Sequence, residues 1–250
     1  MFETYIKKYL TSHSYSNLSP KAVLFDMDGV LFNSMPYHAK AWCSALHKNG
    51  LQFEEKEAYL NEGRTGASTI NIIAQRQYGR DFSDKEIKKI YQDKCDVFNT
   101  FPLAKPFDGG LDLVHQVKQS GLTPMIVTGS GQKSLLGRLE ENYPGLFKQE
   151  LMVTAFDVKI GKPHPEPYLM GLRKGDLKPE EAIVVENAPL GIQSSVAAGI
   201  FTIALNTGEL EDNVLWEAGA NILFPSMRAF CDSWEELLTT FLSTTNRVVE

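Results

Sequence analysis

Short apolar segments alternate with helical segments through the second half of the 250-residue chain, and this alternation constrains the fold more than any other feature. The segments that resemble strands are Leu122–Thr128, Leu151–Thr154, Ala182–Glu186, Phe201–Leu205 and Ile222–Phe224. Helical patterns lie between and after them, at 109–120, 132–142, 165–174, 189–198, 211–218 and 233–243. Apolar strands that alternate with helices predict an α/β fold with a doubly wound parallel sheet.

An earlier apolar segment, which begins at Lys21, is predicted to be the first strand of the same sheet. It ends in Asp26 and Asp28, which are followed at once by Gly29. Side chains two residues apart in an extended chain point the same way, so the two carboxylates are expected to share one pocket. Such a pair can hold Mg²⁺ and do nucleophilic and acid/base chemistry. A capped turn is the alternative, because Asp and Gly also favour turns.

The pattern divides the chain into three parts. Residues 1–20 form a leader, residues 21–33 and 104–250 form the α/β core, and residues 34–103 form a helical insertion after the first strand. In the leader, apolar side chains from Phe2 to Leu10 recur at helical spacing and predict an amphipathic helix. That helix is expected to dock on the domain surface, and partner binding is the alternative.

The insertion contains three amphipathic segments, at 36–50, 68–78 and 84–99. In the third, one stripe is apolar and indicates an ordinary core: Ile87, Ile90, Tyr91, Cys95 and Phe98. The charged residues opposite that stripe, from Lys85 to Lys94, are interpreted as a solvated face.

Charge and cysteine content exclude several classes of function. The net charge is −6 and the pI is near 5.5, which gives no electrostatic support for a nucleic-acid partner. Three separated cysteines without a C-x-x-C pair argue against a disulfide scaffold or a zinc site. No apolar run approaches the roughly 20 residues that a membrane span needs. We expect a cytoplasmic protein without a membrane partner, and the sequence is compatible with a monomer.

Polar residues follow the other predicted strands at their carboxyl ends, where ligands bind in open α/β sheets. Thr128, Gly129 and Ser130 follow one strand, and backbone N–H groups there can cradle an anion. Lys162 comes after another strand, while Glu186 and Asn187 end a third. Each feature alone also suits a turn, a cap or a solvated loop. Together with Asp26 they supply the nucleophile, cation, hydroxyl and metal ligands that phosphoryl transfer requires.

These residues resemble the four motifs of the haloacid dehalogenase-like (HAD) superfamily. Asp26-Met-Asp28-Gly29 resembles the first motif, Thr128-Gly129-Ser130 the second, Lys162-Pro163 the third and Glu186-Asn187 the fourth. The helical insertion is similar to the cap of the β-phosphoglucomutase-like branch, and two further stretches support that likeness: Asn33-Ser34-x-Pro36-x-His38-x3-Trp42 and Ala188-Pro189-Leu190-Gly191-Ile192. The leader departs from compact members. The resemblance implies a Rossmann-like core with an α-helical cap.

The resemblance also implies the role of each motif residue. Asp26 would attack phosphorus to form an aspartyl-phosphate, and Asp28 would act as acid and then base. Thr128 and Lys162 would hold the phosphoryl oxygens, and Gly129 and Ser130 would bind substrate. Mg²⁺ would be held by the Asp26 side chain, the Asp28 backbone carbonyl and the fourth motif, Glu186 and Asn187. Cap residues predicted to bind substrate are His38, Glu62 and Arg64.

Two departures from the family pattern bear on the substrate. Asn187 stands where many relatives have aspartate, so the metal site loses a negative charge. In the cap, Glu62 replaces the lysine of a loop that resembles Lys-Gly-x-x-Arg in β-phosphoglucomutases, and Arg64 is the basic residue that remains. We hypothesise that Glu62 approaches the metal site and restores the charge lost at Asn187. A solvated Glu62 is the alternative.

These features predict a Mg²⁺-dependent phosphohydrolase that acts on a small phosphorylated metabolite or on inorganic pyrophosphate. Asp28 favours phosphate chemistry, since dehalogenases of the superfamily lack that carboxylate. A β-phosphoglucomutase is the first alternative, because His38 matches a histidine that such mutases use. The second is a non-catalytic, phosphate-binding protein on the same fold.

Overall fold

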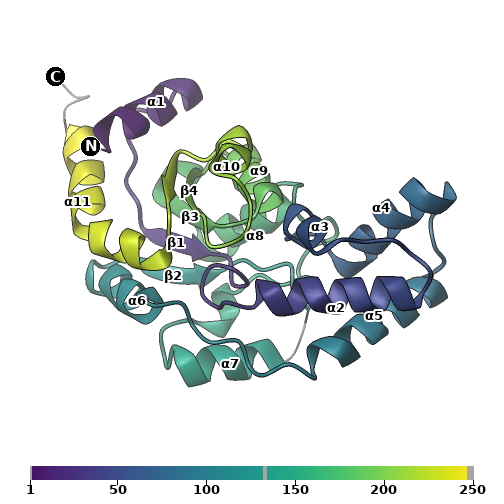
Figure 1. Cartoon of the computed structure of the whole chain (residues 1–250). Helices are drawn as coiled ribbons and strands as arrows, with labels where there is room; N and C mark the ends of the chain where they lie inside the picture. The colour runs from purple at the N-terminus through teal and green to yellow at the C-terminus, as the bar shows by residue number, and fades with distance from the viewer. Residues whose placement is uncertain (1, 132–133, 247–250) are drawn as a thin grey trace.

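The computed structural model describes residues 2–131 and 134–246, and in them five parallel strands form one sheet in the order β2-β1-β3-β4-β5 (Figure 1). The strands are β1 Ala22–Phe25, β2 Thr123–Ile126, β3 Ala182–Glu186, β4 Phe201–Leu205 and β5 Ile222–Phe224. Ala22 pairs with Thr123 on one side and with Ala182 on the other. The strand order therefore reverses at β1, which makes the sheet doubly wound, as predicted.

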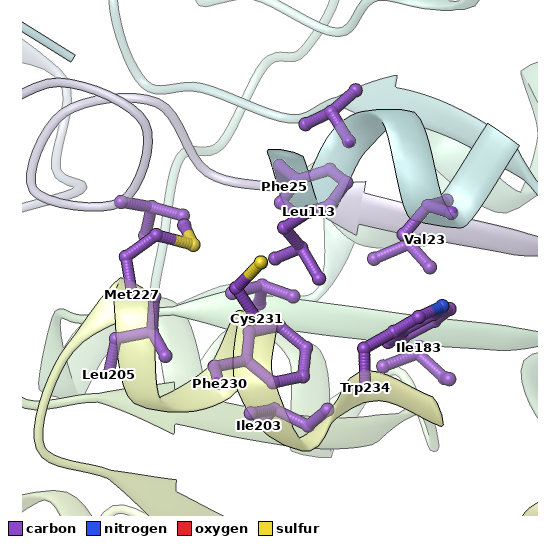
Figure 2. Close-up of a cluster of buried hydrophobic side chains, with 14 of the residues drawn as sticks. Val23, Phe25, Leu113, Ile183, Ile203, Leu205, Met227, Phe230, Cys231 and Trp234 are labelled. Carbon is purple, nitrogen blue, oxygen red and sulfur yellow. The ribbon is translucent and has the colours of Figure 1, made fainter. Parts of the chain in front are cut away.

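The apolar runs are nearly continuous because both faces of the sheet are buried. Along β1, Val23 and Phe25 point into one hydrophobic cluster, and Ala22 and Leu24 point into another. Figure 2 shows the first cluster, where side chains of α11 such as Trp234 pack beneath the strands. The period of two along each strand thus divides its side chains between two helical layers.

Helices cover both faces of the sheet. Three core helices that contribute to the first cluster are α6 Gly110–Gln119, α7 Ser134–Asn142 and α11 Met227–Asn246. Those on the opposite face are α8 Glu166–Gly175, α9 Pro189–Ala197 and α10 Asp212–Glu217. The sheet lies between two helical layers, with the carboxyl ends of its strands open toward the insertion.

The leader helix α1, Glu3–His13, packs beside α11 and adds its apolar side to the first cluster (Figure 1). Phe2 contacts Phe224 of β5, with ring centroids 5.9 Å apart. Tyr9 meets Phe201 of β4 edge to face at 5.1 Å. The helix therefore docks on the domain surface, as the amphipathic pattern predicts.

Tyr9 offers a direct measure of what the leader contributes to stability. Its ring is buried, and its hydroxyl donates to the Gly199 carbonyl at 2.7 Å. We expect Tyr9→Phe to lower the free energy of unfolding by about 1 kcal/mol, since the carbonyl loses one hydrogen bond. Tyr9→Ala should cost about 3–5 kcal/mol, because the ring is also lost. Urea unfolding followed by circular dichroism measures both. Equal stability of Tyr9→Ala and the native chain would show that the leader is not part of the cooperative fold.

The insertion after β1 folds into four helices: α2 Met35–Lys48, α3 Glu55–Leu60, α4 Gly66–Tyr78 and α5 Asp84–Phe98. They enclose a hydrophobic cluster of their own, and Figure 1 shows them grouped on the side away from α1 and α11. The two connections to the core lie side by side, since the Asn33 amide donates to the Lys105 carbonyl at 2.9 Å. We propose that residues 34–103 are the cap and that these paired connections are its hinge.

The structure corrects two of the predicted elements and adds one helix that was not predicted. Leu151–Thr154 is not a strand: Gln149–Leu151 is a 3₁₀ helix, and Val153 forms a single bridge to Val127 at the edge beside β2. The short helix α3 was not predicted. The last helix begins at Met227, earlier than expected. Residues 132–133, where helix 132–142 was predicted to begin, lie outside the described residues.

Across the two described ranges, we find no helix whose length and apolar character would suit a membrane span.

Candidate active site

β1 brings Asp26 and Asp28 to the carboxyl edge of the sheet, where the strand order reverses. The Asp26 amide donates to the Val185 carbonyl of β3 at 3.0 Å, so the ladder continues to the first aspartate. Gly29 then turns the chain with φ +80°, and a Cβ there would lie 2.0 Å from Asn187 Nδ2. Glycine thus allows the loops after β1 and β3 to approach closely. Both aspartates line one cavity.

Lys162, from the loop before α8, is a buried cation next to Asp26. Its ammonium donates to Asp26 Oδ1 at 2.5 Å, to Glu186 Oε1 at 2.6 Å and to the Val127 carbonyl at 3.2 Å. Burial disfavours the ammonium, but the two carboxylates raise the pKa of Lys162. The pKa of Asp26 is raised chiefly by burial. The Lys162 ammonium opposes that rise, and the charge of Glu186 adds to it. Asp26, Lys162 and Glu186 therefore form a buried cluster of charges that interact directly.

Glu186, at the end of β3, is anchored at both carboxylate oxygens. Oε1 accepts from Lys162 and from the Tyr168 hydroxyl, the latter at 2.7 Å. Oε2 accepts the backbone amides of Asn187 at 3.0 Å and Ala188 at 3.2 Å. In this arrangement Glu186 fixes Lys162, and its contribution to a metal site stays a prediction.

Three donors converge on one oxygen of Asp28. Oδ1 accepts from the Ser34 hydroxyl at 2.5 Å, and His38 Nε2 and Arg138 Nη2 lie 3.4 and 3.6 Å from it. Burial by itself would raise the pKa of Asp28, but these neighbours, His38 foremost, lower it below the usual range. The Ser34 hydroxyl and the two cationic side chains thus gather on the Oδ1 side of Asp28.

His38, on α2, is held between Asp28 and a buried lysine of α5. Lys94 Nζ lies 3.0 Å from His38 Nδ1, and an ammonium can only donate, so Nδ1 accepts and the ring proton is assigned to Nε2, facing Asp28. Burial, reinforced by Lys94, lowers the pKa of His38. The Lys94 ammonium also lies 4.9–5.9 Å from the centroids of three aromatic rings: Trp42, Tyr91 and Phe98. The cap thus supplies a fixed donor to Asp28.

The turn after β2 carries Thr128, Gly129 and Ser130, and all three line the cavity. The Thr128 amide donates to the Val153 carbonyl at 2.9 Å. The Thr128 hydroxyl accepts the Ser130 amide at 3.1 Å, so it stabilises the turn as well as facing the cavity. The functional and the turn interpretations of this threonine are therefore compatible.

Glu62 of the cap lies against Asn187 of the core. Asn187 Nδ2 donates to both carboxylate oxygens of Glu62, each at 3.0 Å. Asn187 Oδ1 is buried and has no hydrogen-bond partner within the described part of the chain. Burial, together with nearby Asp26, raises the pKa of Glu62 well above its ordinary value. The two residues that depart from the family pattern are thus in direct contact.

The cavity enclosed by cap and core is small, about 90 Å³. Its cap side presents the two cations Arg64 and Lys94. Arg64 Nε is buried without a hydrogen-bond partner among the described residues, so the guanidinium has an unused donor next to the cavity. The described residues contain no group of three His, Cys, Asp or Glu side chains that forms a ready-made metal site.

The structure brings all the predicted site residues to this one region, and it adds residues that the sequence analysis missed. Lys94 is buried rather than part of a solvated face, so that prediction is wrong. Ser34 and Arg138 were not assigned to Asp28, and Tyr168 was not assigned to Glu186. For Ser34 a signal existed, because it belongs to the stretch that supported the β-phosphoglucomutase likeness.

The fold and the site define a Rossmann-like α/β protein whose paired aspartates lie at the switch point of its sheet, beneath a helical insertion. The chain belongs to the haloacid dehalogenase-like hydrolase family, whose family model matches residues 23–205. The predicted superfamily and its β-phosphoglucomutase-like branch are therefore confirmed.

Known relatives agree with this assignment. Hexitol phosphatase A of Escherichia coli is 32% identical, with 74% of this chain and 83% of the relative covered. A phosphorylated carbohydrates phosphatase of Thermotoga maritima is 29% identical, with coverages of 80% and 92%. Among solved structures, a Bacteroides vulgatus protein provisionally described as a β-phosphoglucomutase is 55% identical, covers 98% of both chains and has a TM-score of 0.93.

Proposed function

We propose that this chain is a Mg²⁺-dependent phosphohydrolase that forms an aspartyl-phosphate, and that inorganic pyrophosphate is its preferred small substrate. The observation that carries the proposal is the pairing of two aspartates with separate environments. Asp26 is bound to the buried Lys162 at 2.5 Å, while Asp28 Oδ1 accepts from Ser34 and lies near His38 and Arg138. One carboxylate is thereby arranged as a nucleophile and the other for proton transfer. The phosphatase names of the relatives support the same chemistry.

The contacts support one choice of reacting atoms. Lys162 binds Oδ1 of Asp26, so Oδ2 attacks phosphorus and the bond to the leaving oxygen breaks. The pKa of Asp28 is lowered, so this carboxylate is ionised and the leaving phosphate departs as an anion without taking a proton from it. Asp28 then removes a proton from the water that hydrolyses the aspartyl-phosphate. Thr128 holds a phosphoryl oxygen, and these oxygens carry the negative charge during transfer. The Lys162 ammonium has three donors and already uses them on Asp26, Glu186 and the Val127 carbonyl, so it would exchange one of these partners for a phosphoryl oxygen.

The residues around the carboxyl end of β3 fit a magnesium ion. Asn187 Oδ1 is an orphaned buried acceptor next to the Glu62 carboxylate, and oxygen atoms are the ligands that Mg²⁺ prefers. Asp26, the Asp28 backbone carbonyl, Asn187 and Glu62 would hold it, with Glu186 behind them. When bound, the ion would offset the charge of the phosphoryl oxygens.

Three properties of the cavity favour pyrophosphate over a sugar phosphate. Its volume of about 90 Å³ is well below the roughly 300 Å³ at which pockets for larger ligands begin. Arg64 and Lys94 face the leaving group, and fixed cations suit an anionic phosphate better than a neutral sugar. The lowered pKa of Asp28 also suits phosphate, which needs less protonation to leave than an alkoxide does.

A phosphate-release screen with Mg²⁺ tests the proposal. It should compare pyrophosphate, sugar monophosphates, and β-glucose 1-phosphate supplied with its bisphosphate activator. We expect the highest kcat/KM for pyrophosphate. Faster release from a hexose or hexitol phosphate would overturn the substrate assignment, and no release from any compound would favour the non-catalytic alternative.

A β-phosphoglucomutase is the second candidate, favoured by the likeness to the Bacteroides vulgatus protein and by the contact between His38 and Asp28. Formation of glucose 6-phosphate from β-glucose 1-phosphate in the same screen would establish it.

Lys94 provides a test of the cap side of the site. We expect Lys94→Met to lower kcat/KM for pyrophosphate about 10- to 100-fold, because His38 loses the donor that fixes its tautomer. The thermal unfolding midpoint should stay or rise, since burial lowers the pKa of Lys94 and an apolar side chain removes that desolvation. Lys88→Met, on the exposed side of α5, is the matched control. An unchanged rate in Lys94→Met would remove this network from the mechanism.

A further inference from the structure

The cap loop, residues 61–65, packs against two core glycines whose backbone conformations do not require glycine. Gly129 and Gly161 both lack a positive φ, so their conformations suit any residue. A Cβ at Gly129 would lie 2.7 Å from the Gly63 carbonyl oxygen. A Cβ at Gly161 would lie 2.9 Å from Thr65 Cγ2. Because glycine has no Cβ, these two positions allow the cap and the core to approach each other closely.

The Thr65 side chain cannot easily move away from Gly161. Thr65 is the N-cap of α4, and its hydroxyl accepts the Ser68 amide at 3.3 Å. A β-branched side chain is stiff at χ1, and rotation about χ1 would break the cap. The other Thr65 atom near that Cβ, the backbone nitrogen, lies 3.4 Å away, an ordinary contact distance. The tight fit therefore depends on one methyl group.

The cap loop that this fit holds in place carries two residues of the site. Glu62 contacts Asn187 at 3.0 Å, and Arg64 lines the cavity. We infer that the contact between the Thr65 methyl group and Gly161 sets how closely the cap loop approaches the core, and that it thereby positions Glu62 on Asn187. Thr65 and Gly161 act through Glu62 and are positioning residues. The kinetic consequence rests on the proposed function, whereas the structural consequence does not.

A double-mutant cycle in the full chain tests the inference. Gly161→Ala adds the clashing Cβ, and Thr65→Ser removes the methyl group while it keeps the capping hydroxyl. The first readout is the side-chain amide resonance of Asn187 in a ¹⁵N–¹H spectrum, identified by its loss in Asn187→Asp. Glu62→Ala defines where that resonance lies without the contact. The second readout is kcat/KM for pyrophosphate with Mg²⁺.

We expect Gly161→Ala to shift the Asn187 resonance toward its position in Glu62→Ala. It should also lower kcat/KM roughly five- to tenfold, the factor that corresponds to the free energy of one lost helix cap. In the Thr65→Ser background, the same alanine should leave the resonance in place and change kcat/KM less than about twofold. Gly137→Ala, where nothing lies within 4 Å, controls for the substitution itself.

Two results would overturn the inference. One is an Asn187 resonance that Gly161→Ala does not move. The other is a shift that persists when Thr65→Ser is added, since the methyl group would then not be its cause. If the native chain does not hydrolyse pyrophosphate, the proposed function fails, and the resonance alone still decides the role of this contact.

Discussion

Replacing Asp26 with asparagine is expected to lower phosphate release at least about 10³-fold, the largest effect of any single substitution. Oδ1 of Asp26 is bound to Lys162 at 2.5 Å, so the second oxygen is the nucleophile, and an amide in its place attacks phosphorus far more weakly. The measurement is phosphate release from pyrophosphate and from a hexitol phosphate, each with Mg²⁺. Both rates should fall together, because the same atom attacks either substrate.

Asp26→Asn must be shown to fold, since it also removes one anionic partner of the buried Lys162. Glu186 remains at 2.6 Å from that ammonium, so we expect a stable variant with a native circular dichroism spectrum. Asp108→Asn is a matched control. Asp108 is an exposed carboxylate of the α/β domain that pairs with Arg228, and it does not line the cavity. Retention of more than about a tenth of the native rate by Asp26→Asn would exclude this residue as the nucleophile.

The sheet could be predicted because its strands are almost entirely buried on both faces. β1, β3 and β4 are buried at every position, which produces uninterrupted apolar runs in the sequence. Leu151–Thr154 has a similar composition but lies outside the edge of β2, where a single bridge forms and no further strand extends the sheet. The helix α3 is six residues long and carries exposed charges in its first turn, so it has no periodic apolar pattern to detect.

The core side of the site followed from the sequence because strand ends in a parallel sheet converge at one edge. On the cap side, the family resemblance predicted His38, Glu62 and Arg64. The lysine that contacts His38 was missed, because its burial depends on how the insertion packs.

Lys94 was assigned to the solvated face for its charge, although its spacing of four residues from Ile90 and from Phe98 places it on the apolar side of the helix. It is buried because α2 and α5 pack together and surround it with Trp42, Tyr91 and Phe98. Arg138 reaches Asp28 from a helix that follows a different strand.

Replacing Glu62 with glutamine is expected to lower kcat for pyrophosphate about 10- to 100-fold and to raise the Mg²⁺ concentration for half-maximal rate by a similar factor. Asn187 brings no charge to the fourth motif, and Glu62 supplies the nearest carboxylate, with both oxygens 3.0 Å from Asn187 Nδ2. Steady-state phosphate release over a range of Mg²⁺ concentrations measures both quantities. Glu55→Gln, an exposed carboxylate on α3, should change neither.

A double substitution that places the carboxylate on the core instead of the cap distinguishes the effect of the Glu62 charge from the effect of its position in the cap. In Glu62→Gln/Asn187→Asp the amide and the carboxylate exchange sides, so the hydrogen bond persists in reverse and the site keeps the same net charge. We expect this double variant to recover most of the Mg²⁺ affinity that Glu62→Gln loses. Asn187→Asp alone should bind Mg²⁺ at least as tightly as the native chain, because two carboxylates then face the ion and the ion offsets their repulsion. Unchanged turnover and Mg²⁺ dependence in Glu62→Gln would show that Glu62 closes the cap without contributing charge, and substrate choice would then depend on Arg64 and Lys94.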